Sequence, residues 1–125
     1  RKTLGFELLS KKIENRFNKD IMSAIVFETR GDISRFNYYL NRSHNKFKNK
    51  IFLKSESLKP GNFYEANYNY NNRQFVSGKN VLIVSNKSEI YDYPNLTDVK
   101  LLDKISVNTI KDIYRTYYLF TGKNK

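Results

Sequence analysis

The sequence predicts an α+β domain, mainly of β-strands: a small OB-like or SH3-like curved sheet or barrel with an N-terminal and a C-terminal helix. Three observations predict this fold class. Short apolar or alternating segments separated by turn residues run from residue 21 to residue 93, helical spacing is confined to the two ends, and no linker or internal repeat interrupts the 125 residues. This order favours one curved sheet over alternating β-α-β units. We expect a single domain over residues 1–125. Because residue 1 is Arg and not Met, this domain can be a fragment of a longer chain.

The first two elements are a helix and a buried strand. Residues 3–18 predict an amphipathic helix, since apolar residues recur there at spacings of three and four: Phe6, Leu9, Ile13 and Phe17. The following stretch, Ile21–Thr29, is apolar on both parities, which is typical of a strand covered on both faces. Its side chains Ile25 and Phe27 are therefore expected in the core.

Basic and apolar residues alternate along the next part of the chain. Gly31-Asp32 predicts a turn into a half-exposed strand, Ile33–Leu40, whose more polar face carries Arg35 and Tyr39. In Arg42–Lys54 four lysines fall on even positions, whereas three apolar residues fall on odd ones. An extended conformation would align these amines on one face: Lys46, Lys48, Lys50 and Lys54.

Four more short strands are expected before residue 94: Asn62–Tyr70, Arg73–Val76, Val81–Val84 and Glu89–Tyr93. The first follows a turn at Pro60-Gly61 and places Tyr64, Tyr68 and Tyr70 on one face. That face can be core or an exposed aromatic platform. The third is wholly apolar, so its side chains are expected in the core: Val81, Ile83 and Val84.

The C-terminal third predicts a buried segment and then a helix. Val99–Ile105 fits a helix turn or a strand, so only its burial is expected. Helical spacing follows at Ile110, Ile113, Tyr114, Tyr117 and Tyr118, and Gly122 is expected to end that helix.

Composition excludes several classes of protein. The chain has 23 Lys and Arg against 12 Asp and Glu, a formal net charge of +11, with no Cys and one His. Disulfide frameworks, zinc fingers and clustered metal ligands are therefore missing, and no glycine-rich phosphate loop occurs. No apolar run approaches the roughly 18 residues of a membrane span. We expect a cytoplasmic protein that needs no membrane, metal or cofactor.

The charge and the aromatic residues together indicate a nucleic-acid partner. Residues 35–54 contain six bases and no acid. Neutralised phosphates release counterions, which gives salt-sensitive affinity, and aromatic rings stack on the bases of single strands. We expect single-stranded DNA or RNA to be bound by phosphate contacts and stacking from twelve residues: Arg35, Tyr39, Arg42, Lys46, Lys48, Lys50, Lys54, Tyr64, Tyr68, Tyr70, Arg73 and Lys79. An ordinary solvated basic face is the competing interpretation.

One family is similar in part. The stretch Pro60-Gly61-Asn62-Phe63-Tyr64-Glu65-Ala66, followed by Gly78-Lys79-Asn80-Val81-Leu82-Ile83-Val84-Ser85-Asn86, resembles the opening hairpin of the PemK/MazF toxin endoribonucleases. Leu101–Ile105 is similar to a later strand of that family. The resemblance implies a small SH3-like barrel that cleaves RNA without a metal. Where the family has Arg-Pro before the apolar strand, this chain has Lys79-Asn80.

Two alternatives to a binding protein stay open. A metal-independent endoribonuclease would use Arg73 or Lys79 to stabilise the phosphorane and His44 or a Tyr to transfer the proton. A protein-interaction or inhibitor module would cover an acidic surface or offer a sheet edge to its partner. Cleavage of RNA by the protein in EDTA would identify the ribonuclease. Binding to a protein partner that survives excess oligonucleotide would identify the interaction module.

Overall fold

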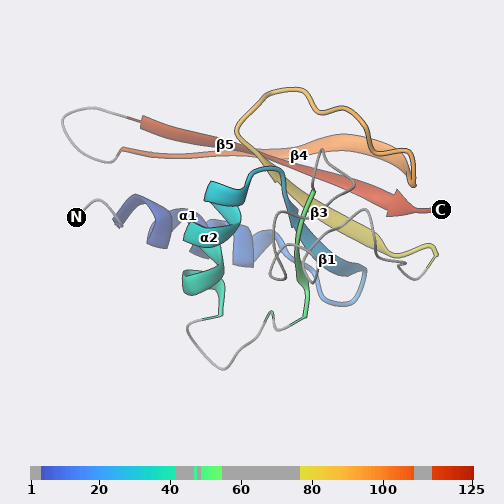
Figure 1. Cartoon of the computed structure of the whole chain (residues 1–125), viewed down its shortest axis with the longest axis horizontal. Helices are drawn as coiled ribbons and strands as arrows, with labels where there is room; N and C mark the ends of the chain where they lie inside the picture. Colours follow the sequence, from blue (N-terminus) through green and yellow to red (C-terminus); the bar gives the residue numbers. More distant parts are fainter. Residues whose placement is uncertain (1–3, 42–46, 48, 55–76, 109–113) are drawn as a thin grey trace.

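The computed structural model describes residues 4–41, 47, 49–54, 77–108 and 114–125 (Figure 1). Their helices and strands follow in the order α1 (Leu4–Arg16), β1 (Met22–Phe27), α2 (Arg30–Leu40), β2 (Ile51–Leu53), β3 (Asn80–Ser85), β4 (Leu96–Asn108) and β5 (Tyr114–Asn124). The strands form one mixed sheet of order β2-β1-β3-β5-β4. The expected class, α+β and mainly β, is confirmed. The sheet is not closed, so the OB-like or SH3-like barrel is not confirmed.

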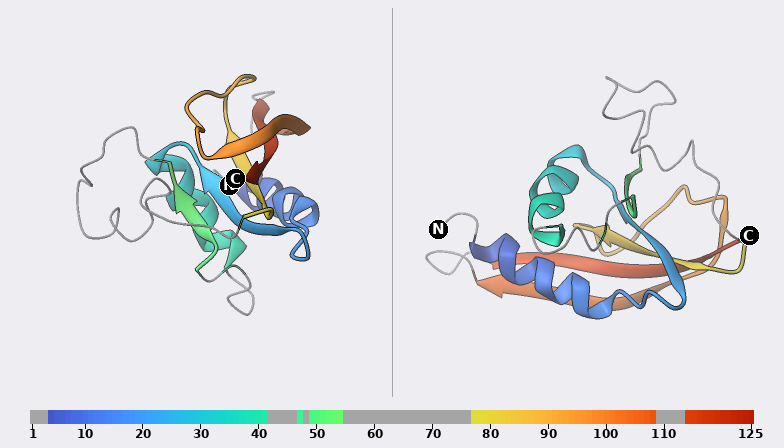
Figure 2. Two further views of the ribbon diagram at one scale, coloured as in Figure 1. Left: turned by 90° about the vertical axis from the view of Figure 1, so that its right-hand side faces the viewer. Right: turned by 90° about the horizontal axis from the view of Figure 1, so that it is seen from below.

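Both faces of the sheet bury apolar side chains. The helices α1 and α2 cover one face (Figure 2), where Ile25, Phe27 and Leu82 join the larger core cluster. Ala24 and Val26 point to the opposite face and pack with residues of the connection 86–95, among them Tyr93. A strand with core on both faces has apolar residues at both odd and even positions, which explains why Ser23 is the one polar residue of β1. The expected core residues are all fully buried: Ile25, Phe27, Val81, Ile83 and Val84.

The first helix is confirmed, and it is held to the rest of the fold by aromatic rings. Phe6 of α1 meets Phe36 of α2 edge to face at 5.3 Å between ring centroids. Phe36 stacks on Phe27 of β1 at 5.3 Å and meets Tyr117 of β5 edge to face at 5.2 Å. Edge-to-face and offset aromatic pairs contribute roughly 0.5–1.5 kcal/mol beyond their buried area. One cluster of rings therefore joins both helices to the sheet.

The predicted strand Ile33–Leu40 is wrong, because this segment belongs to helix α2. The Thr29 hydroxyl caps the helix by accepting a hydrogen bond of 3.1 Å from the Asp32 backbone N–H. Gly31-Asp32 is accordingly its first turn and not a hairpin. The buried apolar residues lie at spacings of three and four: Ile33, Phe36 and Leu40. A helix places all three on one face, whereas a strand would place Ile33 on the face opposite the other two.

The expectation against β-α-β units is also wrong. Strand β1 pairs with β2 in parallel, with Ile25 opposite Ile51 and Phe27 opposite Leu53. Two parallel strands cannot be joined by a tight hairpin and need a crossover, which is usually a helix. Helix α2 lies within the connection between these two strands, so the N-terminal half contains a β-α-β unit.

The predicted C-terminal helix is wrong as well. The chain from Tyr114 to Asn124 is the strand β5, which pairs with β3 and β4, and Gly122 lies inside it. Alternate side chains face opposite sides of the sheet: Tyr117 packs in the cluster under the helices, whereas Phe120 packs in the other one. Ile110 and Ile113 lie outside the described residues.

Two further segments differ from expectation. Val99–Ile105 is part of β4, an edge strand of the sheet, and its expected burial holds for Ile105 but not for Val99 or Leu101, which are 39% and 52% exposed. An edge strand has a neighbour on one side only, and Leu101, which is opposite Phe120 of β5, lies on the face away from the helices. Glu89–Tyr93 is irregular and not a strand. The predicted strands Asn62–Tyr70 and Arg73–Val76 lie outside the described residues, and neither described helix is long and apolar enough to cross a membrane.

Candidate nucleic-acid interface

Five of the twelve predicted contact residues belong to the described part of the chain: Arg35, Tyr39, Lys50, Lys54 and Lys79. The other seven lie outside it: Arg42, Lys46, Lys48, Tyr64, Tyr68, Tyr70 and Arg73. His44 and Arg73, which the ribonuclease alternative invokes, are also outside the described residues.

The predicted row of amines is interrupted. Among the described residues of Arg42–Lys54 the strand covers only Ile51–Leu53, and before it the Lys50 backbone N–H donates a hydrogen bond of 3.0 Å to the Phe47 carbonyl in a turn. Lys50 and Lys54 therefore flank β2 at its two ends. The Lys50 amine lies 5.9 Å from the centroid of the Phe17 ring, whereas Lys54 lies at the carboxyl end of the strand. These two amines cannot belong to one continuous row on a single strand face.

Lys54 and Lys79 each hold a neighbouring loop. The Lys54 amine lies 3.9 Å from the centroid of the Tyr93 ring and donates to the Tyr91 carbonyl. The Lys79 amine donates a hydrogen bond of 2.8 Å to the Asp20 carbonyl, beside the amino end of β1. Both amines have partners within the protein, and each partner lies on a neighbouring loop, so both help to anchor loops. Their contact with nucleic acid stays a prediction.

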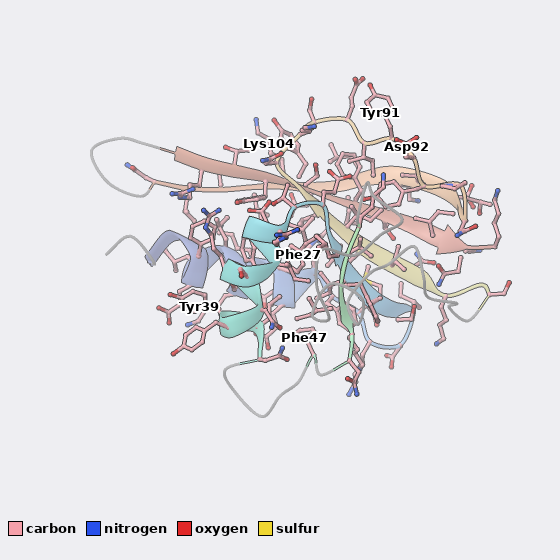
Figure 3. All side chains as sticks on the ribbon, viewed as in Figure 1. Phe27, Tyr39, Phe47, Tyr91, Asp92 and Lys104 are labelled. Carbon is pink, nitrogen blue, oxygen red and sulfur yellow. The ribbon has the colours of Figure 1, made fainter. Side chains whose placement is uncertain are left out.

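Arg35 and Tyr39 lie on one face of α2. They are four residues apart, which brings side chains together on a helix. The side chain of Arg35 is 55% exposed, and Tyr39 is half-buried against the core cluster. Figure 3 shows the Tyr39 ring pointing outward from the lower end of α2. Its neighbour Tyr38, which alternation had placed with the buried residues, is 66% exposed and meets Tyr39 edge to face at 5.0 Å.

A second arginine joins this surface from the sheet. The guanidinium carbon of Arg115, near the start of β5, lies 4.6 Å from the centroid of the Phe6 ring, and that of Arg35 lies 5.4 Å from the same centroid. Both values fall within the roughly 6 Å that cation–π attraction requires. Phe6 is 4% exposed, so the two arginines rest over an almost buried ring. We call Arg35, Tyr38, Tyr39 and Arg115 the α2 face.

A buried carboxylate orients one of these arginines. Asp32 is 3% exposed and lies 3.8 Å from Arg35, three residues along the helix. It also accepts a hydrogen bond of 2.7 Å from the Tyr117 hydroxyl. Burial, followed by this bond to the carboxylate, raises the pKa of Tyr117, so the phenol stays protonated and keeps donating. Among the described residues no ion pair of Arg115 is found, so its charge is available to an anion from outside.

The sequence could not have indicated Arg115. It lies within the segment expected to be helical, and its approach to Phe6 depends on tertiary structure that joins residues 109 positions apart. Within the part of the chain that the structure describes, no three His, Cys, Asp or Glu side chains gather as metal ligands. The α2 face itself offers positive charge and aromatic surface.

Comparison with protein-family models, curated proteins and solved structures gives no match to this chain. The similarity to the PemK/MazF toxins thus stays a resemblance of short segments.

Proposed function

We propose that this protein binds single-stranded nucleic acid in the cytoplasm and that the α2 face is part of the binding surface. The observation that carries the proposal is the placement of two exposed guanidinium groups, from Arg35 and Arg115, over the Phe6 ring, next to a helix that also exposes the ring of Tyr38. Because the sheet is open, the proposed surface is a helix face and not the wall of a barrel.

Guanidinium groups suit the phosphate part of such a ligand. Arginine presents several N–H donors in a planar fork that matches phosphate oxygens and stays charged at any physiological pH. Asp32 fixes Arg35 from the buried side, which leaves the exposed side of its guanidinium for a ligand. The formal net charge of +11 supports this contact, since a basic protein attracts polyanions over distances longer than one contact.

Tyrosine rings suit the bases of a single strand. Side chains three and four residues apart on a helix have Cβ atoms about 5–6 Å apart, so Tyr38 and Tyr39 lie next to Arg35. A base that leaves the stack can lie on Tyr38 while its phosphate meets the arginine. Duplex bases are covered by stacking on both sides and cannot use the ring in this way. The α2 face therefore favours single strands over duplex.

Fluorescence anisotropy tests the proposal directly. Labelled single-stranded DNA, single-stranded RNA and duplex DNA of equal length are titrated at two salt concentrations. We expect steep loss of affinity with salt and tighter binding of both single strands than of duplex. Equal affinity for duplex would contradict the single-strand assignment, and binding that resists salt and excess oligonucleotide would favour a protein partner.

The ribonuclease alternative is decided by the same samples. Lys79, one of its two proposed catalytic cations, donates a hydrogen bond to the Asp20 carbonyl, which holds its amine near the amino end of β1. We expect RNA recovered from the titration in EDTA to be intact. Cleavage under those conditions would assign the protein to metal-independent nucleases instead.

A further inference from the structure

A second polar site lies at the other end of β5, away from the α2 face. An open pocket of about 440 Å³ is lined there by Asn80, Asp98, Val99, Lys100, Thr121 and Lys123. Arg115 and Lys123 are eight residues apart on an extended strand, which corresponds to about 27 Å. One phosphate or one nucleotide cannot touch both sites.

Strand register explains why the two lysines meet. Lys100 of β4 is directly opposite Thr121 of β5, and Lys123 is the next residue on the same face of β5. Lys100 and Lys123 are therefore diagonal neighbours, whose Cβ atoms in an antiparallel pair lie roughly 7–8 Å apart or less. Lysine side chains are long enough to converge across that separation. Among the described residues neither amine has an ion pair or a hydrogen bond, and both lysines line the pocket.

A β-bulge adds an acidic group to the same pocket. Between the pairs Thr97–Lys123 and Lys100–Thr121, two residues of β4, Asp98 and Val99, face one residue of β5. Asp98 has a φ of 54°, in the left-handed region that costs most side chains about 1 kcal/mol or more. Bulges redirect side chains, and this one brings a carboxylate to a pocket that regular alternation would have left with lysines alone.

The floor of the pocket holds a buried donor. Thr121 is 5% exposed, and its hydroxyl oxygen accepts a hydrogen bond of 3.2 Å from the Asn80 side-chain amide. No acceptor for the Thr121 hydroxyl proton is found in the part of the chain that the structure describes. A buried hydroxyl normally uses its proton, and here the space next to it is the pocket. The donor is thus placed to meet an oxygen of a ligand.

We propose that this pocket binds a small phosphate monoester, specifically a nucleoside monophosphate. The amines of Lys100 and Lys123 and the Thr121 hydroxyl take the phosphate oxygens, since all three groups donate hydrogen bonds and two are positively charged. The Asp98 carboxylate accepts from an amino group of the base. A simple anion would leave the Asp98 carboxylate without a donor and would meet its repulsion. The volume also lies within the range of about 300–1,000 Å³ that is usual for small-molecule sites.

Adenosine monophosphate, adenosine and inorganic phosphate are the probes for this site. Chemical shifts of ¹⁵N-labelled protein are followed during each titration, and calorimetry gives the dissociation constants. We expect adenosine monophosphate to bind at least tenfold tighter than either fragment, with the largest shifts at the amides of Asp98, Val99 and Gly122. Shifts confined to α2 and the start of β5, or no binding at millimolar ligand, would overturn the proposal.

Three single variants test the assigned roles. Lys100→Gln and Lys123→Gln should each lower the affinity for adenosine monophosphate about tenfold, as expected when a hydrogen bond to a charged group is lost. Asp98→Asn keeps a side chain that tolerates left-handed backbone. This variant should lower the affinity for adenosine monophosphate but not the affinity for inorganic phosphate. Unchanged nucleotide affinity in either lysine variant would refute the phosphate site. Unchanged nucleotide affinity in Asp98→Asn would refute the contact to the base.

A matched control separates this pocket from general charge effects. Lys104 also lies on β4 but on the opposite face of the sheet, with its amine 5.8 Å from the centroid of the Tyr118 ring. Lys104→Gln removes the same charge, so it should leave nucleotide binding unchanged. Oligonucleotide binding should be intact in all pocket variants, and the pocket proposal stands or falls independently of the α2 face.

Discussion

Tyr117 donates a hydrogen bond of 2.7 Å to the buried carboxylate of Asp32, and this bond joins β5 to the first turn of α2. It matters for the candidate interface because Asp32 is also the residue beside Arg35. The sheet thus controls the position of an arginine that belongs to a helix. Stability and pH dependence should both reveal this connection.

Replacing Tyr117 with Phe should destabilise the protein by roughly 1–3 kcal/mol at pH 7, because a buried carboxylate loses its donor. In the native protein burial and this bond raise the pKa of Tyr117 above its ordinary value near 10. The unfolded chain therefore releases the phenol proton first, and stability that is complete below pH 10 declines as the pH rises above it. Urea unfolding at pH 7 and pH 11 should show a smaller loss between the two pH values in the variant than in the native protein.

Arg35→Gln and Arg115→Gln should each weaken single-strand binding and lower the salt dependence. Each lost phosphate contact reduces the slope of log affinity against log salt by about 0.7 for single strands. Lys104→Gln is the control, since it removes one charge on the other face of the sheet. Anisotropy titrations at four salt concentrations give the slopes. If the control lowers the slope as much as the arginine variants do, the nucleic acid responds to the overall charge of the protein and not to the α2 face.

Tyr38→Ala should lower single-strand affinity by roughly 1–3 kcal/mol and leave the salt slope unchanged, because a stacking ring carries no charge. Tyr38→Phe should bind like the native protein, since the face of the ring remains. Tyr91, which is 69% exposed on the connection before β4, provides the matched control as Tyr91→Ala. An affinity of Tyr38→Ala equal to that of the control would remove the ring from the interface.

Ile83→Ala should destabilise the protein by roughly 2–5 kcal/mol, since Ile83 is fully buried in the cluster opposite the helices. Leu101→Ala removes apolar atoms from a side chain that is 52% exposed and should change stability by about 0.5 kcal/mol or less. Chemical denaturation measures both. Similar losses in the two variants would mean that the second core cluster is not formed.

Gly122→Ala should destabilise the protein by roughly 1–3 kcal/mol through overpacking. A Cβ atom at this position would lie 2.8 Å from Leu96 Cδ1 and 3.2 Å from Val99 Cγ2, both closer than ordinary contact. Gly31→Ala is the contrasting variant, because it lies in an exposed helical turn with no contact closer than 3.5 Å. It should be neutral or stabilising. Thermal unfolding that ranks the two variants in the reverse order would contradict the packing around the bulge.

Sequence patterns predicted the segments whose environment is simple. The first helix has one buried face, and β1 and β3 are buried on both, so periodicity and apolar runs indicated them correctly. Helix α2 was mistaken for a strand because Phe36, Tyr38 and Leu40 alternate with polar residues. Thr29 and Asp32, which cap the helix, were the contrary signal. β5 was mistaken for a helix because its run Tyr117–Phe120 is buried on both faces and so fits either period.

The candidate site was predicted in part for a related reason. Arg35 and Tyr39 are four residues apart, a spacing that puts two side chains on the same face of a strand and of a helix alike. Their shared face was therefore expected correctly from a wrong secondary structure. Lys50 and Lys54 have the same spacing, but Lys50 belongs to the turn before β2, so its amine lies by Phe17 whereas that of Lys54 lies by Tyr93. The approach of Arg115 to Phe6 and the bulge at Asp98 depend on strand pairing, which local sequence does not encode.

The position of β1 between β2 and β3 has a consequence for how the chain reaches its fold. β1 can pair with β2 once residue 53 has been synthesised, but its other parallel partner begins only at residue 80. Until then a strand with apolar residues on both faces presents an unsatisfied row of backbone donors and acceptors. Such an edge is a template for association between nascent chains, and pairings across long loops form slowly. We therefore expect refolding yield to fall with protein concentration, and early intermediates to bind chaperones that recognise extended apolar segments.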